Sequence, residues 1–348
     1  MSFSRRSFLR SAAAVSLVPT LAQAAAAAPG VTDLAVGSIG HSIAHFPLYV
    51  GAQQGFFQQN GVDIGKVTEF STGALTATAL TAGSIDVASS VITDVFSLAK
   101  AGRSGKILAV SANAYYIDIV ASKAFLDATK LTEKSSLADK IRAMKGKNIG
   151  VTGPGSGTEA LVIYLLKQAN IDRTRDVQLV NVGANIPAVL ATLQTNRIDL
   201  VSFAWPLGQQ AQVEGIGGTF ISPARGEVPE MNQQIQGVVY TTQDEIDKKH
   251  AAIVGFVRGY AATSALILKD PARARDLLKG FYPSLDTRAL DLTLEVYRAT
   301  SVPSNPMPSE AGFSRAVKFH QAAGLIAEDY SYNDLVATKV IADAVGKR

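Results

Sequence analysis

One alternation of strand-like and helix-like segments occurs twice along the chain, and it limits the folds that the chain can adopt. In the first half, short apolar runs typical of buried strands alternate with segments of helical apolar spacing. The predicted strands cover residues 34–37, 62–69, 85–89 and 106–111, and the predicted helices cover residues 47–57, 76–82 and 93–101. Strands that alternate with helices form β-α-β units, in which the strands run parallel.

The alternation restarts after Lys145-Gly146-Lys147. Predicted strands at 148–152, 177–182 and 199–204 are separated by helices at 159–169 and 186–195, and the chain is mainly helical from about residue 244. We therefore predict an α/β fold with two lobes, each a mainly parallel sheet flanked by helices, and a ligand cleft between them. The first lobe comprises residues 31–115 and 240–348, the second comprises 116–239, and extended crossings at 113–118 and 237–242 join them.

The first 24 residues have the order of an export signal. Arg5 and Arg6 precede an alanine-rich stretch that is interrupted by Pro19 and ends in Leu21-Ala22-Gln23-Ala24. The paired arginines resemble the twin-arginine type of signal, so we predict cleavage near Ala24 and a periplasmic protein. Cleavage removes three arginines and lowers the formal net charge from +4 to +1. The basic composition therefore gives no indication of a nucleic-acid partner.

The chain contains no cysteine. This excludes a disulfide framework, thiol chemistry and an N-terminal lipid attached to cysteine. No later apolar run of 18 residues is apparent, and we expect a free, soluble monomer. The glycine-rich segment 150–155 lacks the Gly-Lys-Ser/Thr ending of a P-loop and the G-x-G-x-x-G pattern, so no cofactor is predicted.

Residues Gly40-His41-Ser42-Ile43-Ala44 differ from the G-x-S-x-G nucleophile elbow only in their last residue. Fewer than about 20 mature residues precede Ser42, too few for the upstream oxyanion loop of that hydrolase fold. We therefore predict that Ser42 holds a ligand and that the protein is not an enzyme, with a serine hydrolase as the remote alternative. His41 and His45 have the spacing of a metal pair, but no third ligand is apparent and no metal is predicted.

Four segments resemble a known family in their order along the chain. Residues 47–63, PLYVGAQQGFFQQNGVD, are similar to the opening of the nitrate, sulfonate and taurine group of ABC-transporter substrate-binding proteins. Residues 79–88, 144–151 and 191–199 resemble later segments of the same group, and the resemblance covers residues 33–280. It implies a type II periplasmic binding protein fold that closes on a small molecule and presents it to a membrane permease with its ATPase.

This sequence also departs from the group. Asn196 stands where the group usually has glycine, in a turn that tolerates asparagine. The segment Gly153-Pro154-Gly155-Ser156-Gly157-Thr158 is not diagnostic of the taurine or sulfonate branches, so the substrate is not carried over. The cysteine-rich motif of the related thiamine-precursor enzymes is missing as well.

The candidate ligand-binding residues lie in loops that follow the predicted strands, because ligands of such sheets bind beyond the carboxyl ends of the strands. They are Ser38, His41, Ser42, His45, Thr72, Ser89, Ser90, Asn113, Tyr115, Thr152, Ser156, Thr158 and Trp205. Ser156 and Thr158 have an alternative role as helix caps. Of Tyr115 and Tyr116, we expect one to face the cleft and the other to pack.

The same loops predict a class of ligand. The helices that begin near residues 47 and 159 direct free N–H groups towards the cleft, which favours an anionic group. No lysine or arginine lies in these loops, which disfavours a small, highly charged anion. We therefore predict a small organic anion, a carboxylate or sulfonate with an apolar or aromatic body. A neutral pyrimidine-type nutrient and a sensory binding protein remain as alternatives.

Overall fold

The computed structural model describes residues 30–40, 42–103 and 105–346. The predicted signal at 1–24 and the candidate residue His41 lie outside the described residues. From Val31 onward the chain forms one compact unit.

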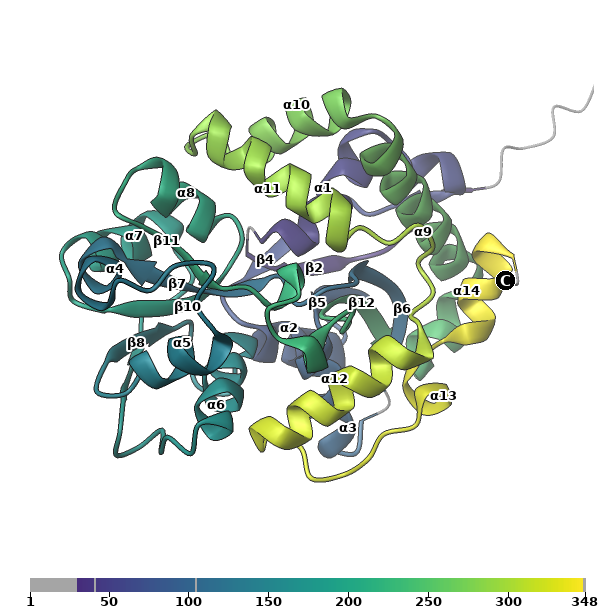
Figure 1. Cartoon of the computed structure of the whole chain (residues 1–348). Helices are drawn as coiled ribbons and strands as arrows, with labels where there is room; N and C mark the ends of the chain where they lie inside the picture. The colour runs from purple at the N-terminus through teal and green to yellow at the C-terminus, as the bar shows by residue number, and fades with distance from the viewer. Residues whose placement is uncertain (1–29, 41, 104, 347–348) are drawn as a thin grey trace, which may run out of the picture. The chain divides into compact units, whose positions relative to one another are not determined.

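The first five-stranded sheet has the order β4-β2-β5-β12-β6 (Figure 1). Its strands are β2 (Val36–Ile39), β4 (Thr68–Phe70), β5 (Val87–Val91), β6 (Gly105–Ala112) and β12 (Gly237–Thr242). β12 is antiparallel to both of its neighbours, whereas the other four strands share one direction. The carboxyl ends of those four strands therefore lie at one edge of the sheet, where β12 begins.

The second five-stranded sheet has the order β11-β7-β10-β8-β9. Its strands are β7 (Ile117–Ser122), β8 (Asn148–Val151), β9 (Gln178–Asn181), β10 (Leu200–Ala204) and β11 (Gly217–Ile221). β7 runs against its two neighbours, and the remaining strands share one direction. One strand in each sheet is thus reversed, and the predicted fold class with mainly parallel sheets is confirmed.

Helices join and flank the strands. They are α1 (Phe46–Gln53), α2 (Gly73–Thr81), α3 (Ile92–Lys100), α4 (Lys123–Thr129), α5 (Leu137–Ala143), α6 (Gly157–Gln168), α7 (Ile186–Gln194), α8 (Leu207–Val213), α9 (Gln243–Lys269), α10 (Pro271–Phe281), α11 (Thr287–Thr300), α12 (Glu310–Ala323), α13 (Tyr332–Leu335) and α14 (Thr338–Val345). Short 3₁₀ turns occur at Ile43–His45, Gln58–Asn60, Pro223–Arg225 and Pro229–Met231, and a small parallel pair is formed by β1 (Thr32–Asp33) and β3 (Val62–Asp63).

Polar caps fix where the helices next to the strand ends begin. Thr72, Ser156 and Asn185 accept hydrogen bonds from backbone N–H groups in the first turns of α2, α6 and α7. Each cap satisfies a donor that the helix itself leaves unpaired. The loops between strands and helices are therefore held in one geometry by their own hydroxyl and amide groups.

Three predictions of local structure need correction. The extended crossing expected at 237–242 is strand β12, whose register joins it to both β5 and β6. The chain instead passes between the two sheets at 113–116 and at 222–236. The strand predicted at 62–69 is divided into β3 and β4. The predicted lobe boundary between residues 239 and 240 falls inside β12. The residue ranges of the two lobes remain a prediction.

Helix α9 is long and apolar enough, by length and composition alone, to cross a membrane. It is the one such helix among the described residues, so the prediction of no such segment after the signal is wrong by this criterion. However, 61% of its apolar window is buried inside the protein, and α9 packs against α1 and α14. Phe256 of α9 stacks on Phe57 at a ring-centroid distance of 4.8 Å, as expected of a core helix.

Candidate functional site

The carboxyl ends of β2, β4, β5 and β6, together with the start of β12, form what we call the first edge. Ser38 of β2 and Ser89 of β5 are register neighbours there, and both are fully buried. His45, in the turn before α1, is also buried, and its Nδ1 lies 2.8 Å from Ser89 Oγ. The Ser38 hydroxyl is buried near the Tyr49 hydroxyl and forms no hydrogen bond of normal geometry among the described residues. Buried hydroxyls are usually well hydrogen-bonded, so this one can still bond to a ligand.

A carboxyl group that the sequence analysis missed lies at the first edge. Asp94, in the first turn of α3, accepts a hydrogen bond from the Ser90 hydroxyl. Burial raises the pKa of Asp94 to about 6, and the hydrogen bonds from Ser90 and from the Val91 backbone act in the opposite direction. A Cβ atom at Gly73 would overlap this carboxyl group, so α2 begins directly against it. The sequence did contain a signal for Asp94: it is an acidic residue four positions after Ser90, in the Ser-Ser pair near the end of a predicted strand.

A group of buried tyrosines lies near the same edge, and we call Tyr116, Tyr260, Tyr282 and Tyr297 the tyrosine cluster. Burial raises the pKa of all four hydroxyls, and Tyr116 interacts electrostatically with each of the other three. The four hydroxyls therefore stay protonated and can donate hydrogen bonds at neutral pH. Tyr297 donates to the Ser111 carbonyl oxygen at 3.0 Å, whereas the Tyr260 hydroxyl has no hydrogen-bond partner of normal geometry among the described residues.

Ser42 faces the tyrosine cluster. Its hydroxyl is buried near the Tyr116 hydroxyl but forms no hydrogen bond of normal geometry with any described residue. In particular, it is not bonded to a histidine, as an activated nucleophile would be. His320 bonds instead to Thr93 and to the Ala316 carbonyl oxygen. Ser42, on which the remote hydrolase alternative depends, therefore has no bonded histidine among the described residues.

The carboxyl ends of β8, β9, β10 and β11 and the start of β7 form what we call the second edge. Its hydroxyls bond to one another: Thr158 Oγ1 lies 2.9 Å from Thr152 Oγ1 and 2.7 Å from Ser156 Oγ. Ser156 also accepts from the Glu159 N–H at 3.2 Å and donates to the Gly153 carbonyl oxygen. The three hydroxyls hold the loop before α6 together, and Ser156 caps the helix, which is the alternative role predicted for Ser156 and Thr158.

Trp205 and Asp118 form a buried pair at the second edge. The Trp205 Nε1 donates to Asp118 Oδ2 at 2.7 Å, and both residues are almost completely buried. Burial raises the pKa of Asp118 to about 7, while Ser222, Trp205 and Arg225 act in the opposite direction. The polar atom of Trp205 therefore already has a partner, and Asp118 is a second buried acid that the sequence analysis did not identify.

Tyr115 and Tyr116 have different neighbours, although both are buried. The Tyr115 hydroxyl donates to the Gly157 carbonyl oxygen at 2.6 Å, and its ring packs edge-on against Phe319. The Tyr116 side chain instead lies near Ser42 and Asp94. Because Tyr115 is satisfied by α6, Tyr116 is the better candidate for ligand contact. The sequence alone did not decide which of Tyr115 and Tyr116 faces the ligand.

Gln236, in the crossing before β12, is another residue that the sequence analysis missed. It is completely buried, and neither its amide nitrogen nor its amide oxygen has a hydrogen-bond partner among the described residues. A Cβ atom at Gly157 would lie 2.9 Å from Gln236 Nε2, so the amide is next to the start of α6. Its unpaired donor and acceptor point to a missing polar partner.

The remaining candidates have structural contacts. Thr72 caps α2 by accepting from the Leu75 N–H at 3.3 Å, and the Asn113 backbone N–H donates to the Ser301 carbonyl oxygen. Among the described residues, no group of three or more His, Cys, Asp or Glu side chains could hold a metal ion. The ligand-binding set as a whole stays a prediction. The structure brings five of its members, Ser38, Ser42, His45, Ser89 and Ser90, to the first edge.

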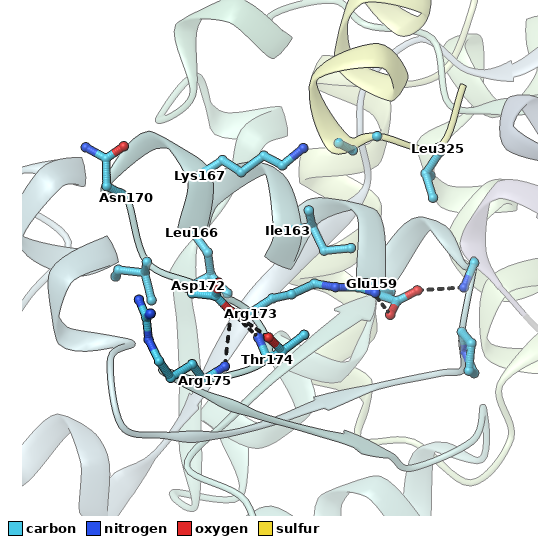
Figure 2. A pocket seen from close by; sticks show the side chains of 15 residues that line it. Glu159, Ile163, Leu166, Lys167, Asn170, Asp172, Arg173, Thr174, Arg175 and Leu325 are labelled. Atoms are coloured by element: carbon cyan, nitrogen blue, oxygen red, sulfur yellow. Dashed lines mark hydrogen bonds and ion pairs between the residues drawn. The ribbon is translucent and has the colours of Figure 1, made fainter. Parts of the chain in front are cut away.

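Two pockets lie near these residues. One of about 330 Å³ is lined by residues 184–187, at the start of α7, and by residues 281–285, which include Tyr282 of the tyrosine cluster. The other, of about 840 Å³, lies along α6, the segment 170–175 and the end of α12 (Figure 2). Its polar groups are largely paired with one another, as in the Arg173–Glu159 ion pair at 3.1 Å. Tyr282 joins the smaller pocket to the tyrosine cluster, and residues 184–187 on its other side follow β9 of the second edge.

The NMT1-like family matches residues 27–279, which is more than half of the chain. The chain belongs to the NMT1-like family. A relative, YtlA of Bacillus subtilis (strain 168), which is named a binding protein, is 24% identical over 335 residues that cover 90% of each chain.

Solved structures with the same fold include ABC-importer binding proteins. The ligand-binding component of an ABC-type import system from Staphylococcus aureus superposes with a TM-score of 0.71 at 17% identity, covering 91% of this chain and 100% of that one. The periplasmic nitrate-binding protein NrtA from Synechocystis PCC 6803 gives 0.68 at 15% identity, with coverages of 91% and 90%. Sulfonate-binding proteins share the fold too. The predicted resemblance of this NMT1-like chain to the nitrate, sulfonate and taurine group is confirmed, and so is the two-lobed periplasmic binding protein fold.

Proposed function

We propose that this chain is the substrate-binding component of an ABC importer. It is exported, loses its signal near Ala24 and acts as a soluble periplasmic monomer. It binds a small organic molecule between its two sheets and delivers it to a membrane permease driven by an ATPase, without chemical change to the ligand. Family membership and the fold of the import-system component support this role.

The observation that carries the proposal is a set of buried polar groups, at the first edge and beside the start of α6, that lack hydrogen bonds of normal geometry among the described residues. Ser38 Oγ, Ser42 Oγ and both amide atoms of Gln236 are buried and form no hydrogen bond of normal geometry among the described residues, although Ser38 lies near Tyr49 and Ser42 near Tyr116. Leaving a polar group buried and unpaired costs about 1–3 kcal/mol each. A ligand that supplies the missing bonds removes this cost, so the first edge is a surface prepared for a polar molecule.

The proposed ligand has a polar end and an apolar or aromatic body. The polar end binds Ser42 and Tyr116, and the body extends towards the pocket of about 330 Å³ lined by Phe281, Tyr282 and Pro283. Pockets of this size accept small organic molecules. Hydroxyl groups both donate and accept, so they suit the organic anion predicted from the sequence and the neutral alternative equally well.

A thermal-shift screen tests the proposal. The mature protein is heated with small carboxylates, sulfonates, pyrimidines, amides and amines, and calorimetry gives the Kd of each hit. A ligand at 100 times its Kd stabilises the folded protein by about 2.7 kcal/mol, which is a shift of several degrees. The proposal requires a hit that is not consumed during the titration. If no compound class raises the melting temperature, or if a hit is hydrolysed and Ser42→Ala abolishes turnover, the proposal is wrong.

A further inference from the structure

Asp94 places a carboxyl group inside the proposed binding site. It is 9% exposed, and its neighbours Ser90, Gly73 and Tyr116 all belong to the first edge or to the loops beside it. Tyr240 of β12 also interacts electrostatically with it. None of the ion pairs among the described residues involves Asp94. Its charge is therefore not neutralised by a basic side chain in the described part of the chain.

The Asp94 carboxyl group lies at the N-termini of two helices, α2 and α3. Gly73 is the first residue of α2, and a Cβ atom there would overlap the Asp94 carboxyl. Asp94 also lies in the first turn of α3. The positive end of a helix dipole favours an anion, and here the protein's own carboxyl group occupies that place for two helices. An incoming carboxylate or sulfonate would meet a negative charge instead of free N–H groups.

The carboxyl group still has capacity to accept hydrogen bonds. Its two oxygens offer about four lone-pair sites, and the Ser90 hydroxyl and the Val91 N–H are the donors that act on it among the described residues. The nearby Tyr240 hydroxyl is buried and has no hydrogen-bond partner among those residues. A ligand with N–H groups would add donors on this side of the site, and Tyr240 would remain as a further donor or acceptor.

We propose that Asp94 determines the specificity of the site, by accepting a hydrogen bond from an N–H donor of a neutral or cationic ligand and by excluding carboxylates and sulfonates. This inference rests on the proposed function and narrows its ligand to molecules with an amide, amidine, amine or aminopyrimidine group. It differs from the organic anion predicted from the sequence, which rested on the helices that begin near residues 47 and 159, because Asp94 adds a negative charge at the starts of α2 and α3.

The test uses probes that share one ring and differ in the polar group. Benzamidine, benzamide, benzoate and benzenesulfonate are titrated into the wild type and into Asp94→Asn, alongside the compounds found in the thermal-shift screen. Asp127→Asn is the matched control, because Asp127 lies on the surface of α4 and the variant has the same net charge. Circular dichroism and melting curves establish that each variant is folded, and Ser90→Ala serves as a second variant that keeps the carboxyl group.

We expect the wild type to bind neutral or cationic N–H donors at least tenfold more tightly than anions with the same body. Asp94→Asn should reduce that preference at least tenfold, and Asp127→Asn should leave it unchanged. If the wild type prefers the carboxylates or sulfonates, the inference about Asp94 is overturned while the proposed function stands. If neither the probes nor any screened compound binds the wild type, the proposed function and this inference are both overturned.

Discussion

The two strand-end edges of this protein contain the same kinds of residue but use them differently. At the second edge, Thr152, Ser156 and Thr158 bond to one another and to the backbone at the start of α6. At the first edge, Ser38 and Ser42 are buried and form no hydrogen bond of normal geometry among the described residues. Ser222, after β11 at the second edge, is also buried without a hydrogen bond of normal geometry among those residues, so the contrast is between the hydroxyls before α6 and those before α1. We therefore expect ligand affinity to depend mainly on the first edge and stability mainly on the second.

Their buried acids also differ. Asp118 at the second edge accepts from Trp205 Nε1 at 2.7 Å, while Asp94 at the first edge lies beside the proposed ligand position. Burial raises the pKa of both carboxyls above the usual 3.8, to about 7 for Asp118 and about 6 for Asp94. A folded protein that holds a proton more tightly than its unfolded chain loses stability as the pH rises through that range.

The largest expected effect is on the pH dependence of the unfolding free energy when Asp118, the buried acid of the second edge, is replaced. Asp118→Asn removes a group that binds a proton in the folded state up to a pH of about 7 but in the unfolded state only below about 3.8. The unfolding free energy of the variant minus that of the wild type should therefore rise between pH 4 and pH 7, by about 1.4 kcal/mol per pH unit. Urea denaturation over this range measures it. Parallel pH profiles for the two proteins would contradict the assignment to Asp118.

A second prediction compares the two neighbouring tyrosines. Tyr116→Phe removes a hydroxyl near Ser42 and Asp94 and should weaken binding of the screened ligand by about 1–3 kcal/mol, roughly five- to hundredfold. Tyr115→Phe is the matched control, because it removes the hydrogen bond to the Gly157 carbonyl oxygen from the adjacent position. Its main effect should be a lower melting temperature. Calorimetry that finds the larger loss of affinity in Tyr115→Phe would reverse our choice between the two.

A smaller effect is expected where the end of α6 meets the end of α12. The Lys167 ammonium group donates to the Ala322 carbonyl oxygen at 2.7 Å, at the end of α12. A cation at a helix C-terminus contributes roughly 0.5 kcal/mol, so Lys167→Gln should lower the unfolding free energy by about that amount in low salt. The loss should shrink as salt is added, because salt screens exposed charges. A loss that is independent of salt would point to packing instead.

Much of the fold was predictable because its strands and helices alternate in the sequence. β5 and β10 are continuous buried runs, and the Ser-Ser end of β5 marked a strand end that belongs to the first edge. Only residues 117–118 of β7 fell within a predicted crossing, and neither β7, whose apolar run Asp118 interrupts, nor β11, which begins with two glycines, was predicted as a strand. Their strand character depends on pairing with each other and with β10, which is a long-range property.

The candidate site was predictable only where its residues follow strands. Tyr260, Tyr282 and Tyr297 come from α9, the end of α10 and α11, and their spacing in the sequence is that of ordinary core residues. Folding brings them to Tyr116, which no local pattern could indicate. Asp94 had a local signal, but its importance depends on Gly73 and Tyr116, which lie on other segments.

The most direct test of the central claim compares one serine from each edge. Ser42→Ala and Ser156→Ala each remove a single hydroxyl, and calorimetry with the screened ligand gives Kd for both while thermal melting gives their stability. We expect Ser42→Ala to raise Kd by roughly fivefold with little change in Tm, and Ser156→Ala to lose about 1 kcal/mol of stability with an unchanged Kd. An unchanged Kd for Ser42→Ala together with a larger Kd for Ser156→Ala would contradict the account.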